Sequence, residues 1–364
     1  MKKFIKLNIL LLILLLSSLA YSSQKQFNIT FVSPGYDDHD FWGIAHNFAR
    51  AAAKDLGINF KVIYPKEGNR FTYLPALESA LTDAIKPDYI IAHFYKTIVV
   101  DILELSKKYN TPIFMVNSAI SKEEKNDKYL RDKYPNFLGH MFPNEVQAGY
   151  LLAQYLIQKQ KMNHPNKTIN VVGITGHRET SVTHERNEGL RKAAHEENAV
   201  VKQIAFTDWS ADMAFRLSQR LIFRNDDLHV FWAASDSMSI SIKKAILESN
   251  KESQIITGGI DWTKDAIRKI KNGKLDASVG GHFTEVGFAL VLLYDYMNGK
   301  DFYEELGGTI KTEMSLLTNE NIDKYYKLLT EQNWEQIDFR KYSKTFNPKI
   351  KKYNFSFKTL IENR

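Results

Sequence analysis

Cysteine is absent from the whole 364-residue sequence, which excludes disulfides and thiolate chemistry. Also missing are the G-x-G-x-x-G and Walker A patterns that hold nucleotide phosphates, and the G-x-S-x-G turn of many serine hydrolases. No low-complexity segment occurs. What remains is a globular composition, 44% hydrophobic and 25% charged, in a chain long enough for two domains.

Negative charge is scarce at both ends of the chain. The net charge is +7, but residues 1–22 contribute +3 and residues 340–364 contribute +7, which leaves −3 for everything between. The expected folded body is therefore mildly acidic, and we do not expect it to bind nucleic acid. We interpret residues 336–364 as a basic C-terminal tail.

The N-terminus resembles a secretory signal. Lys2, Lys3 and Lys6 precede the apolar run 7–16, which is too short to span a bilayer, and small residues follow near position 20. We expect residues 1–22 to be a signal peptide that is cleaved on export to the periplasm; the alternative is an uncleaved anchor. Without disulfides, the exported protein depends on its core for stability.

Apolar runs alternate with segments of helical periodicity along most of the chain. Strands are predicted at 27–32, 60–64, 88–94, 111–116 and 137–142, and again at 168–175, 200–206, 228–233, 255–260 and 276–279. The most complete unit is 27–57, a strand, a polar loop and a helix that ends at Gly57. Continuous rather than alternating apolar runs indicate parallel strands covered on both faces. We predict an α/β fold with two doubly wound parallel-sheet lobes.

Aromatic and hydrogen-bonding residues follow the predicted strands at 37–42, 117–118, 177–186, 208–209, 235–236, 261–262 and 282. In parallel α/β sheets ligands collect at these carboxyl ends. Aromatic faces stack on the C–H faces of a sugar ring, and Asp, Asn, Arg and His bind its hydroxyls. Each residue also has a structural alternative. Trp42 and Trp209 could be core residues, and Arg186 could pair with Glu185 or Glu188. Asp40, Asp208 and Asp236 could cap helices, with Ser210 and Ser235 as the neighbouring cap candidates.

Metal binding and catalysis have weaker support. The group His177, Glu179, His184 and Glu185 and the group Asp37 to Asp40 contain metal-binding residue types, but neither has the spacing of a known metal motif. We therefore expect no metal and no cofactor. A carbohydrate-acting hydrolase using two carboxylates, such as Asp37 with Asp261, is an alternative that nothing in their sequence context favours.

Six ordered segments resemble the type I periplasmic binding proteins, in particular the ribose/galactose-type group that includes the autoinducer-2 receptor. They are DFW at 40–42, PIFMVN at 112–117, HERNEGL at 184–190, DW at 208–209, VFWAASDSM at 230–238 and GGIDWTKDA at 258–266. The resemblance covers about residues 27–330. It implies a non-enzymatic receptor in which a hinge of three strands joins two lobes around a ligand cleft.

The resemblance also assigns roles to residues. Phe41 and Trp42 would stack on the ligand from one lobe and Trp209 from the other, while Asn117 and Asp261 would bind hydroxyls. His184 or Arg186 would take the place of the family's ligand arginine, Ser235 that of an Asn or Thr, and Gly281 or His282 would be the last contact. Asp40 and Trp262, the neighbours of Phe41 and Asp261, complete the expected set.

Lobe boundaries and partners follow from the same resemblance. The first lobe is expected to comprise 23–141 plus 283–307 and the second 142–282 plus 308–335, with hinge strands near 138–144, 279–284 and 306–313. The protein is expected to be a monomer that passes a sugar-like molecule to an ABC permease or signals to a membrane sensor kinase. His184 departs from the ribose pattern. Gly281 stands where the autoinducer-2 receptor has its second arginine, and the C-terminal stretch 312–318 resembles that receptor.

Overall fold

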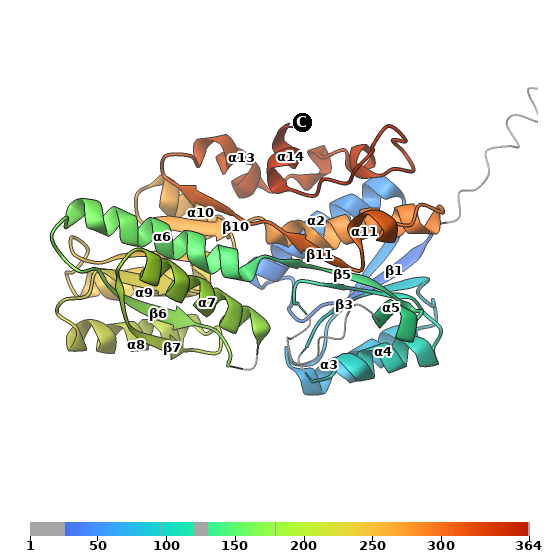
Figure 1. Cartoon of the computed structure of the whole chain (residues 1–364). Helices are drawn as coiled ribbons and strands as arrows, with labels where there is room; N and C mark the ends of the chain where they lie inside the picture. Colours follow the sequence, from blue (N-terminus) through green and yellow to red (C-terminus); the bar gives the residue numbers. More distant parts are fainter. Residues whose placement is uncertain (1–25, 96, 120–129, 179, 363–364) are drawn as a thin grey trace, which may run out of the picture.

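The computed structural model describes residues 26–95, 97–119, 130–178 and 180–362 (Figure 1). The predicted signal peptide and most of the charged loop at 121–135 lie outside them. Two six-stranded sheets, each flanked by helices, form two lobes, which confirms the predicted α/β fold. In the described part of the chain, no helix combines the length and hydropathy needed to cross a membrane.

The first sheet has the strand order β11-β5-β4-β3-β1-β2, and all its pairings are parallel. Its strands are β1 (Asn28–Val32), β2 (Asn59–Ile63), β3 (Tyr89–His93), β4 (Ile113–Val116), β5 (Phe137–Pro143) and β11 (Thr309–Thr312). The helices of this lobe are α2 (Asp40–Leu56), α3 (Arg70–Leu81), α4 (Val99–Lys108), α5 (Leu130–Lys133), α11 (Glu285–Met297) and α12 (Tyr303–Leu306).

The second sheet has the strand order β12-β10-β9-β8-β6-β7 and is parallel except for β12, which pairs antiparallel with β10. Its strands are β6 (Asn170–Thr175), β7 (Val200–Phe206), β8 (Val230–Ala233), β9 (Ile256–Ile260), β10 (Ala277–Gly280) and β12 (Ser315–Thr318). Its helices are α6 (Glu145–Asn163), α7 (Ser181–Glu196), α8 (Ala211–Arg224), α9 (Asp236–Glu248) and α10 (Lys264–Lys271).

The opening unit forms as predicted, with β1 followed by α2. Gly57 ends α2 in the left-handed conformation, with φ 71°. The N-cap differs from the predicted alternative: His39, not Asp40, is extended, and its Nδ1 accepts hydrogen bonds from the backbone N–H of Phe41 and Trp42. The cap holds the first turn of α2, which carries Phe41 and Trp42, at the carboxyl end of β1.

The chain crosses between the sheets three times. It passes from β5 into α6, from β10 through the 3-10 turn η2 (His282–Thr284) into α11, and from β11 to β12. The third crossing differs from the boundary expected at 308, because β11 still pairs in register with β5, Thr309 opposite His140. The second lobe is re-entered only after Thr312.

The C-terminal segment folds back over the protein rather than extending as a tail. It contains α13 (Asp323–Glu331), η3 (Trp334–Gln336), η4 (Phe339–Tyr342) and α14 (Phe357–Glu362). Figure 1 shows these elements lying across one face of the two lobes, over α10, α2 and α11. The rings of Phe48 and Phe339 are 5.1 Å apart, and those of Trp262 and Phe357 are 5.2 Å apart. The lack of periodicity in this segment reflects short, irregular elements that pack through scattered aromatic residues.

Candidate functional site

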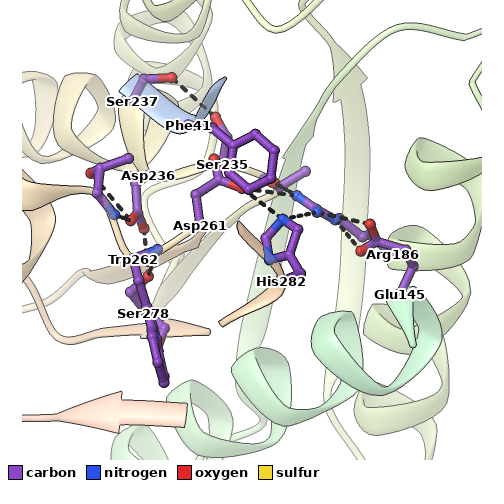
Figure 2. Close-up of polar contacts among 12 residues, drawn as sticks. Phe41, Glu145, Arg186, Ser235, Asp236, Ser237, Asp261, Trp262, Ser278 and His282 are labelled. Carbon is purple, nitrogen blue, oxygen red and sulfur yellow. Dashed lines mark hydrogen bonds and ion pairs between the residues drawn. The ribbon is translucent and has the colours of Figure 1, made fainter. Parts of the chain in front are cut away.

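Arg186, on α7, is the centre of a buried polar cluster between the lobes (Figure 2). Only 3% of it is exposed. Its Nε donates to Glu145 Oε2 at 2.5 Å and its Nη2 donates to Glu145 Oε1 at 3.0 Å, so the two side chains pair through two parallel bonds. Its Nη1 donates to the Ala234 carbonyl at 2.6 Å. The surface pairing with Glu185 or Glu188 is thus replaced by a buried pair with the start of α6.

Asp261, at the carboxyl end of β9, lies beside Arg186. Its Oδ1 lies 3.6 Å from Arg186 Nη1 and 3.7 Å from His282 Nε2. Its backbone adopts φ 137°, a conformation that residues with a side chain rarely adopt. Burial raises the pKa of the Asp261 carboxyl well above its ordinary value of 3.8, although Arg186 opposes the shift. The shift favours the protonated carboxyl, which can donate a hydrogen bond as well as accept one.

His282 brings the first lobe into the cluster. Its ring stacks on Phe41 with 4.5 Å between centroids and 22° between planes, and its Nε2 is 3.5 Å from Arg186 Nη2. Burial, with a smaller contribution from Arg186, lowers the pKa of His282 well below 6.5, so the imidazole is neutral. Its Nδ1 is buried and makes no hydrogen bond to the described residues. A neutral ring with an unused nitrogen can hydrogen-bond a hydroxyl.

Two tryptophans stand at the edges of the cluster. Trp42 is half-buried, with its ring 5.0 Å from Phe41, 6.2 Å from His46 and 5.8 Å from His93. Trp209, also half-buried, lies against Gly176, and the Arg186 guanidinium carbon is 5.8 Å from its ring centre. A side chain at Gly176 would collide with this indole, because an added Cβ would be 2.1 Å from it. Each indole thus has both a packing contact and an accessible part.

Ser235 and Asn117 lie at the strand ends where they were expected. Ser235 is the N-cap of α9, where its Oγ accepts from the Met238 N–H, and it directly follows Ala234, whose carbonyl binds Arg186. Asn117 follows β4 with φ 72° and donates its backbone N–H to the Met141 carbonyl. Asp40 is exposed in the first turn of α2.

Two of the expected site residues point elsewhere. His184 is exposed, and its Nε2 lies 2.6 Å from the Arg178 carbonyl oxygen, because a residue two positions before Arg186 falls on a different face of the helix. Trp262 is 1% exposed, bonds the Ser278 carbonyl through Nε1, and packs against the C-terminal segment. The structure therefore does not bring either side chain to the cluster.

Sequence reasoning missed three contributors. Glu145, the partner of Arg186, directly follows the predicted hinge strand near 138–144, and nothing else in the sequence marked it as a site residue. His93 ends β3 and was visible only as a polar residue closing an apolar run. Asp236 was interpreted as a helix cap, but its carboxylate accepts from the Thr263 N–H at 2.8 Å and from Ser278 Oγ at 2.7 Å. Burial raises the pKa of Asp236 to about 6.

The acidic loop before α2 has a structural role. Asp37 accepts hydrogen bonds from Arg50 and Tyr64 and lies 2.9 Å from His46 Nδ1. The hydrogen bond from Arg50 lowers the pKa of Asp37 well below 3.8. Among the described residues, no group of three His, Asp or Glu side chains is arranged to hold a metal ion. Asp37 therefore ties its loop to α2 and to the residue that follows β2.

Comparison with known proteins is consistent with this geometry. Residues 29–301 match the family described as periplasmic binding protein domain. The ribose import binding protein of Haemophilus influenzae is 28% identical over 146 residues, 40% of this chain and 47% of that protein, so the match spans about half of this curated relative. Among solved structures, a periplasmic sugar-binding protein from Pseudomonas fluorescens is 25% identical, with a TM-score of 0.82 over 92% of this chain and 99% of its own.

A second solved structure has lower identity but the same fold. A solute-binding protein of an ABC transporter from Actinobacillus succinogenes, with bound D-allose, is 17% identical to this chain. The TM-score is 0.72, and the match covers 82% of this chain and 100% of that chain. The family match runs from β1 to the residues just after α11 and so includes parts of both lobes. The chain belongs to the periplasmic binding protein family.

Proposed function

We propose that this protein captures a neutral sugar or sugar-like polyol between its lobes and delivers it to an ABC importer. The observation that carries the proposal is the state of Arg186. Its guanidinium is bound by Glu145 through Nε and Nη2 and by the Ala234 carbonyl through Nη1, with Asp261 beside it. With its charge balanced by a buried carboxylate, Arg186 offers an anionic ligand little net attraction.

The groups beside Arg186 suit hydroxyls and ring faces. Asp261 and the neutral His282 supply hydrogen-bonding atoms, while Phe41, Trp42 and Trp209 supply aromatic faces. A sugar ring presents both kinds of surface, and its absence of charge fits the balanced arginine. The relatives that are described as ribose import binding proteins, and the neighbour with bound D-allose, support the same ligand class.

The remaining roles follow from this proposal. The protein would be exported to the periplasm through its N-terminal signal and act as a monomer without catalysis. Delivery to an ABC permease is favoured over signalling to a sensor kinase by the import proteins among the relatives. The alternative ligand, the borate form of autoinducer-2, is anionic, and Gly281 leaves the position of a second arginine empty. It is therefore the informative negative control.

The test is a binding panel with D-ribose, D-allose, L-arabinose, D-galactose and borate-bound autoinducer-2. A sugar at 100 times its Kd should stabilise the protein by about 2.7 kcal/mol, seen as a rise in Tm. Calorimetry then gives the Kd. Trp42→Ala should weaken binding at least about tenfold, the equivalent of ~1.4 kcal/mol. The matched control is Phe223→Ala on α8, an exposed aromatic residue outside the site.

Two results would contradict the proposal. One is a panel in which no sugar shifts the Tm. The other is preferential binding of the anionic borate ester, which would show that Arg186 keeps charge available for a ligand. If Trp42→Ala does not fold, Trp42 is a core residue that stabilises the first lobe rather than a ligand contact.

A further inference from the structure

Two short segments carry Asp261 and His282 into the site, and both have unusual backbones. Asp261 and Trp262 have φ values of 137° and 62°, and Gly281, which precedes His282, has φ 111°. Residues with a side chain adopt such angles only where surrounding contacts hold them. The position of the Asp261 carboxyl therefore depends on what packs behind its segment. Gly281 adopts its angle without strain and does not by itself fix the His282 ring, so that ring also depends on packing.

Trp262 is the support behind Asp261. Its Nε1 donates to the Ser278 carbonyl at 3.2 Å, and its backbone N–H donates to Ser278 Oγ at 3.3 Å. One face covers Gly280, where an added Cβ would be 2.5 Å from the indole. The ring of Phe357 packs against this indole, with 5.2 Å between centroids and 75° between planes.

Phe357 also supports the segment that carries His282. Its ring lies 5.5 Å from that of Phe283, the residue after His282. A Cβ placed on Gly281 would be 3.6 Å from Phe357 Cβ, an ordinary van der Waals distance, so the Phe357 side chain lies beside Gly281. One side chain from α14 thus contacts both segments that supply polar groups to the site.

The segment around Phe357 is anchored to the first lobe. Asp295, on α11, accepts hydrogen bonds from the backbone N–H of Lys344 at 2.7 Å and of Thr345 at 2.9 Å, and from the Tyr353 hydroxyl at 2.8 Å. Leu360, on the same helix as Phe357, is 1% exposed. Phe357 is therefore held in place from the first lobe while it contacts Trp262 of the second.

We propose that Phe357 is a positioning residue of the binding site, which packs behind Trp262 and Gly281 and thereby holds Asp261 and His282 where the ligand meets them. The proposal rests on the proposed function for its statement about affinity. Phe357 lies beyond residue 301, where the family match ends, so the C-terminal segment would be part of the binding apparatus of this chain. Among the described residues its aromatic contacts are Trp262, Phe283 and Tyr325, none of which is a polar group of the cluster.

The test compares Phe357→Ala with Phe355→Ala. Phe355 belongs to the same C-terminal segment, but its ring packs on Phe288 and Tyr353 rather than on the two segments that carry Asp261 and His282. The first measurement is amide hydrogen exchange in the ligand-free proteins. Phe357→Ala should speed exchange at residues 261–263 and 281–284, and Phe355→Ala should leave these amides unchanged.

The second measurement is affinity for D-ribose and D-allose by calorimetry. Phe357→Ala should raise the Kd about tenfold, because misplaced hydrogen-bonding groups weaken contacts to a polar ligand, and Phe355→Ala should change it less than about twofold. Phe357→Leu, which keeps an apolar side chain, should restore most of the affinity. If Phe357→Ala does not fold, Phe357→Leu replaces it, with smaller changes expected at the same amides.

The outcomes separate the two proposals. Unchanged exchange at both segments in Phe357→Ala would overturn the positioning role, and so would equal effects of Phe357→Ala and Phe355→Ala. Faster exchange with an unchanged Kd would overturn it as well. If the wild type binds none of the sugars, the proposed function fails, and the exchange measurement still decides whether Phe357 holds the two segments.

Discussion

Arg186 and Glu145 are both more than nine-tenths buried and joined by two hydrogen bonds. Removing two charges from water is costly, and their attraction repays that cost only while both partners are present. This residue pair decides how much charge the site shows to a ligand. Its integrity can be tested separately from ligand binding.

Glu145→Gln should lower the free energy of unfolding by about 3 kcal/mol, because it removes the carboxylate that pairs with Arg186 through two hydrogen bonds and leaves that buried charge only the more distant Asp261. Urea unfolding followed by circular dichroism measures the change. Asp212→Asn, at the exposed i,i+4 pair with Arg216 on α8, is the matched control and should change stability by less than about 1 kcal/mol. Equal effects of the two substitutions would show that Arg186 is solvated or paired elsewhere.

His282 makes stability depend on pH. Its pKa is lowered well below 6.5 by burial, so the unfolded chain binds a proton at pH values where the folded protein does not. Proton binding by the unfolded chain alone favours unfolding. The free energy of unfolding therefore decreases as the pH falls below about 6.5, by about 1.4 kcal/mol per pH unit for one proton. His282→Gln should remove this slope between pH 6.5 and 5.

Two ionisable neighbours of His282 also affect how the stability of the protein depends on pH. Arg186, 3.5 Å away, opposes protonation, while Asp261, whose carboxyl pKa is raised by burial, contributes stability that falls as the pH rises above 3.8. Because the two effects have opposite signs, the difference between wild type and His282→Gln is the quantity to measure by urea unfolding. The exposed His195→Gln is the control. A variant with the wild-type slope would contradict a neutral, buried His282.

At the scale of elements, local sequence signals placed most of the helices and strands. The predicted strand 200–206 coincides with β7, and Gly57 ends α2 in the left-handed conformation that favours glycine. Capping was harder to assign because adjacent polar residues compete for one position. Ser210 and Ser235, rather than Asp208 and Asp236, cap α8 and α9. The Asp236 carboxylate instead accepts hydrogen bonds from Thr263 and Ser278, which are distant from it in the sequence.

Hydrogen bonds to Asp295 hold the C-terminal segment against α11. Asp295 is fully buried and accepts hydrogen bonds from Ser343, Lys344, Thr345 and Tyr353. Asp295→Asn should cost about 2 to 3 kcal/mol, because the amide group cannot accept all of these bonds and a bond to a charged acceptor contributes ~1.5–3 kcal/mol. It should also make the segment 340–355 the first site of limited proteolysis.

Proteolysis and urea unfolding check this prediction together. Asp212→Asn again serves as the control for removal of a surface carboxylate. If Asp295→Asn loses stability but is first cut elsewhere, Asp295 would stabilise α11 itself rather than the attachment of the segment.

At the scale of the whole molecule, one apolar core extends across both lobes. It includes Phe48 and Phe288 of the first lobe, Ile267 of α10 in the second, and Phe339 and Phe357 of the C-terminal segment. The three chain crossings and this shared core place the lobe contacts on one side of the molecule. Movement of the lobes would then occur as rotation about that side.

Ligand binding should therefore make the protein more compact. We expect small-angle X-ray scattering to give a smaller radius of gyration with a saturating sugar than without it, because Phe41 and Trp42 are on one lobe and Arg186 and Trp209 on the other. Asp261→Asn at the same sugar concentration should show a smaller decrease. An unchanged radius in a wild-type protein that binds sugar would indicate that the lobes are already closed.

The sequence by itself determined the two α/β lobes and the strand-end positions of Asn117, Ser235 and Asp261. These depend on periodicity, turn residues and the order of elements, which are properties of neighbours along the chain. Only the tertiary structure joined Arg186 to Glu145, turned Trp262 away from the site and brought Phe357 behind it. Such contacts depend on side chains from distant elements that compete for the same buried space, and no local pattern records which of them meet.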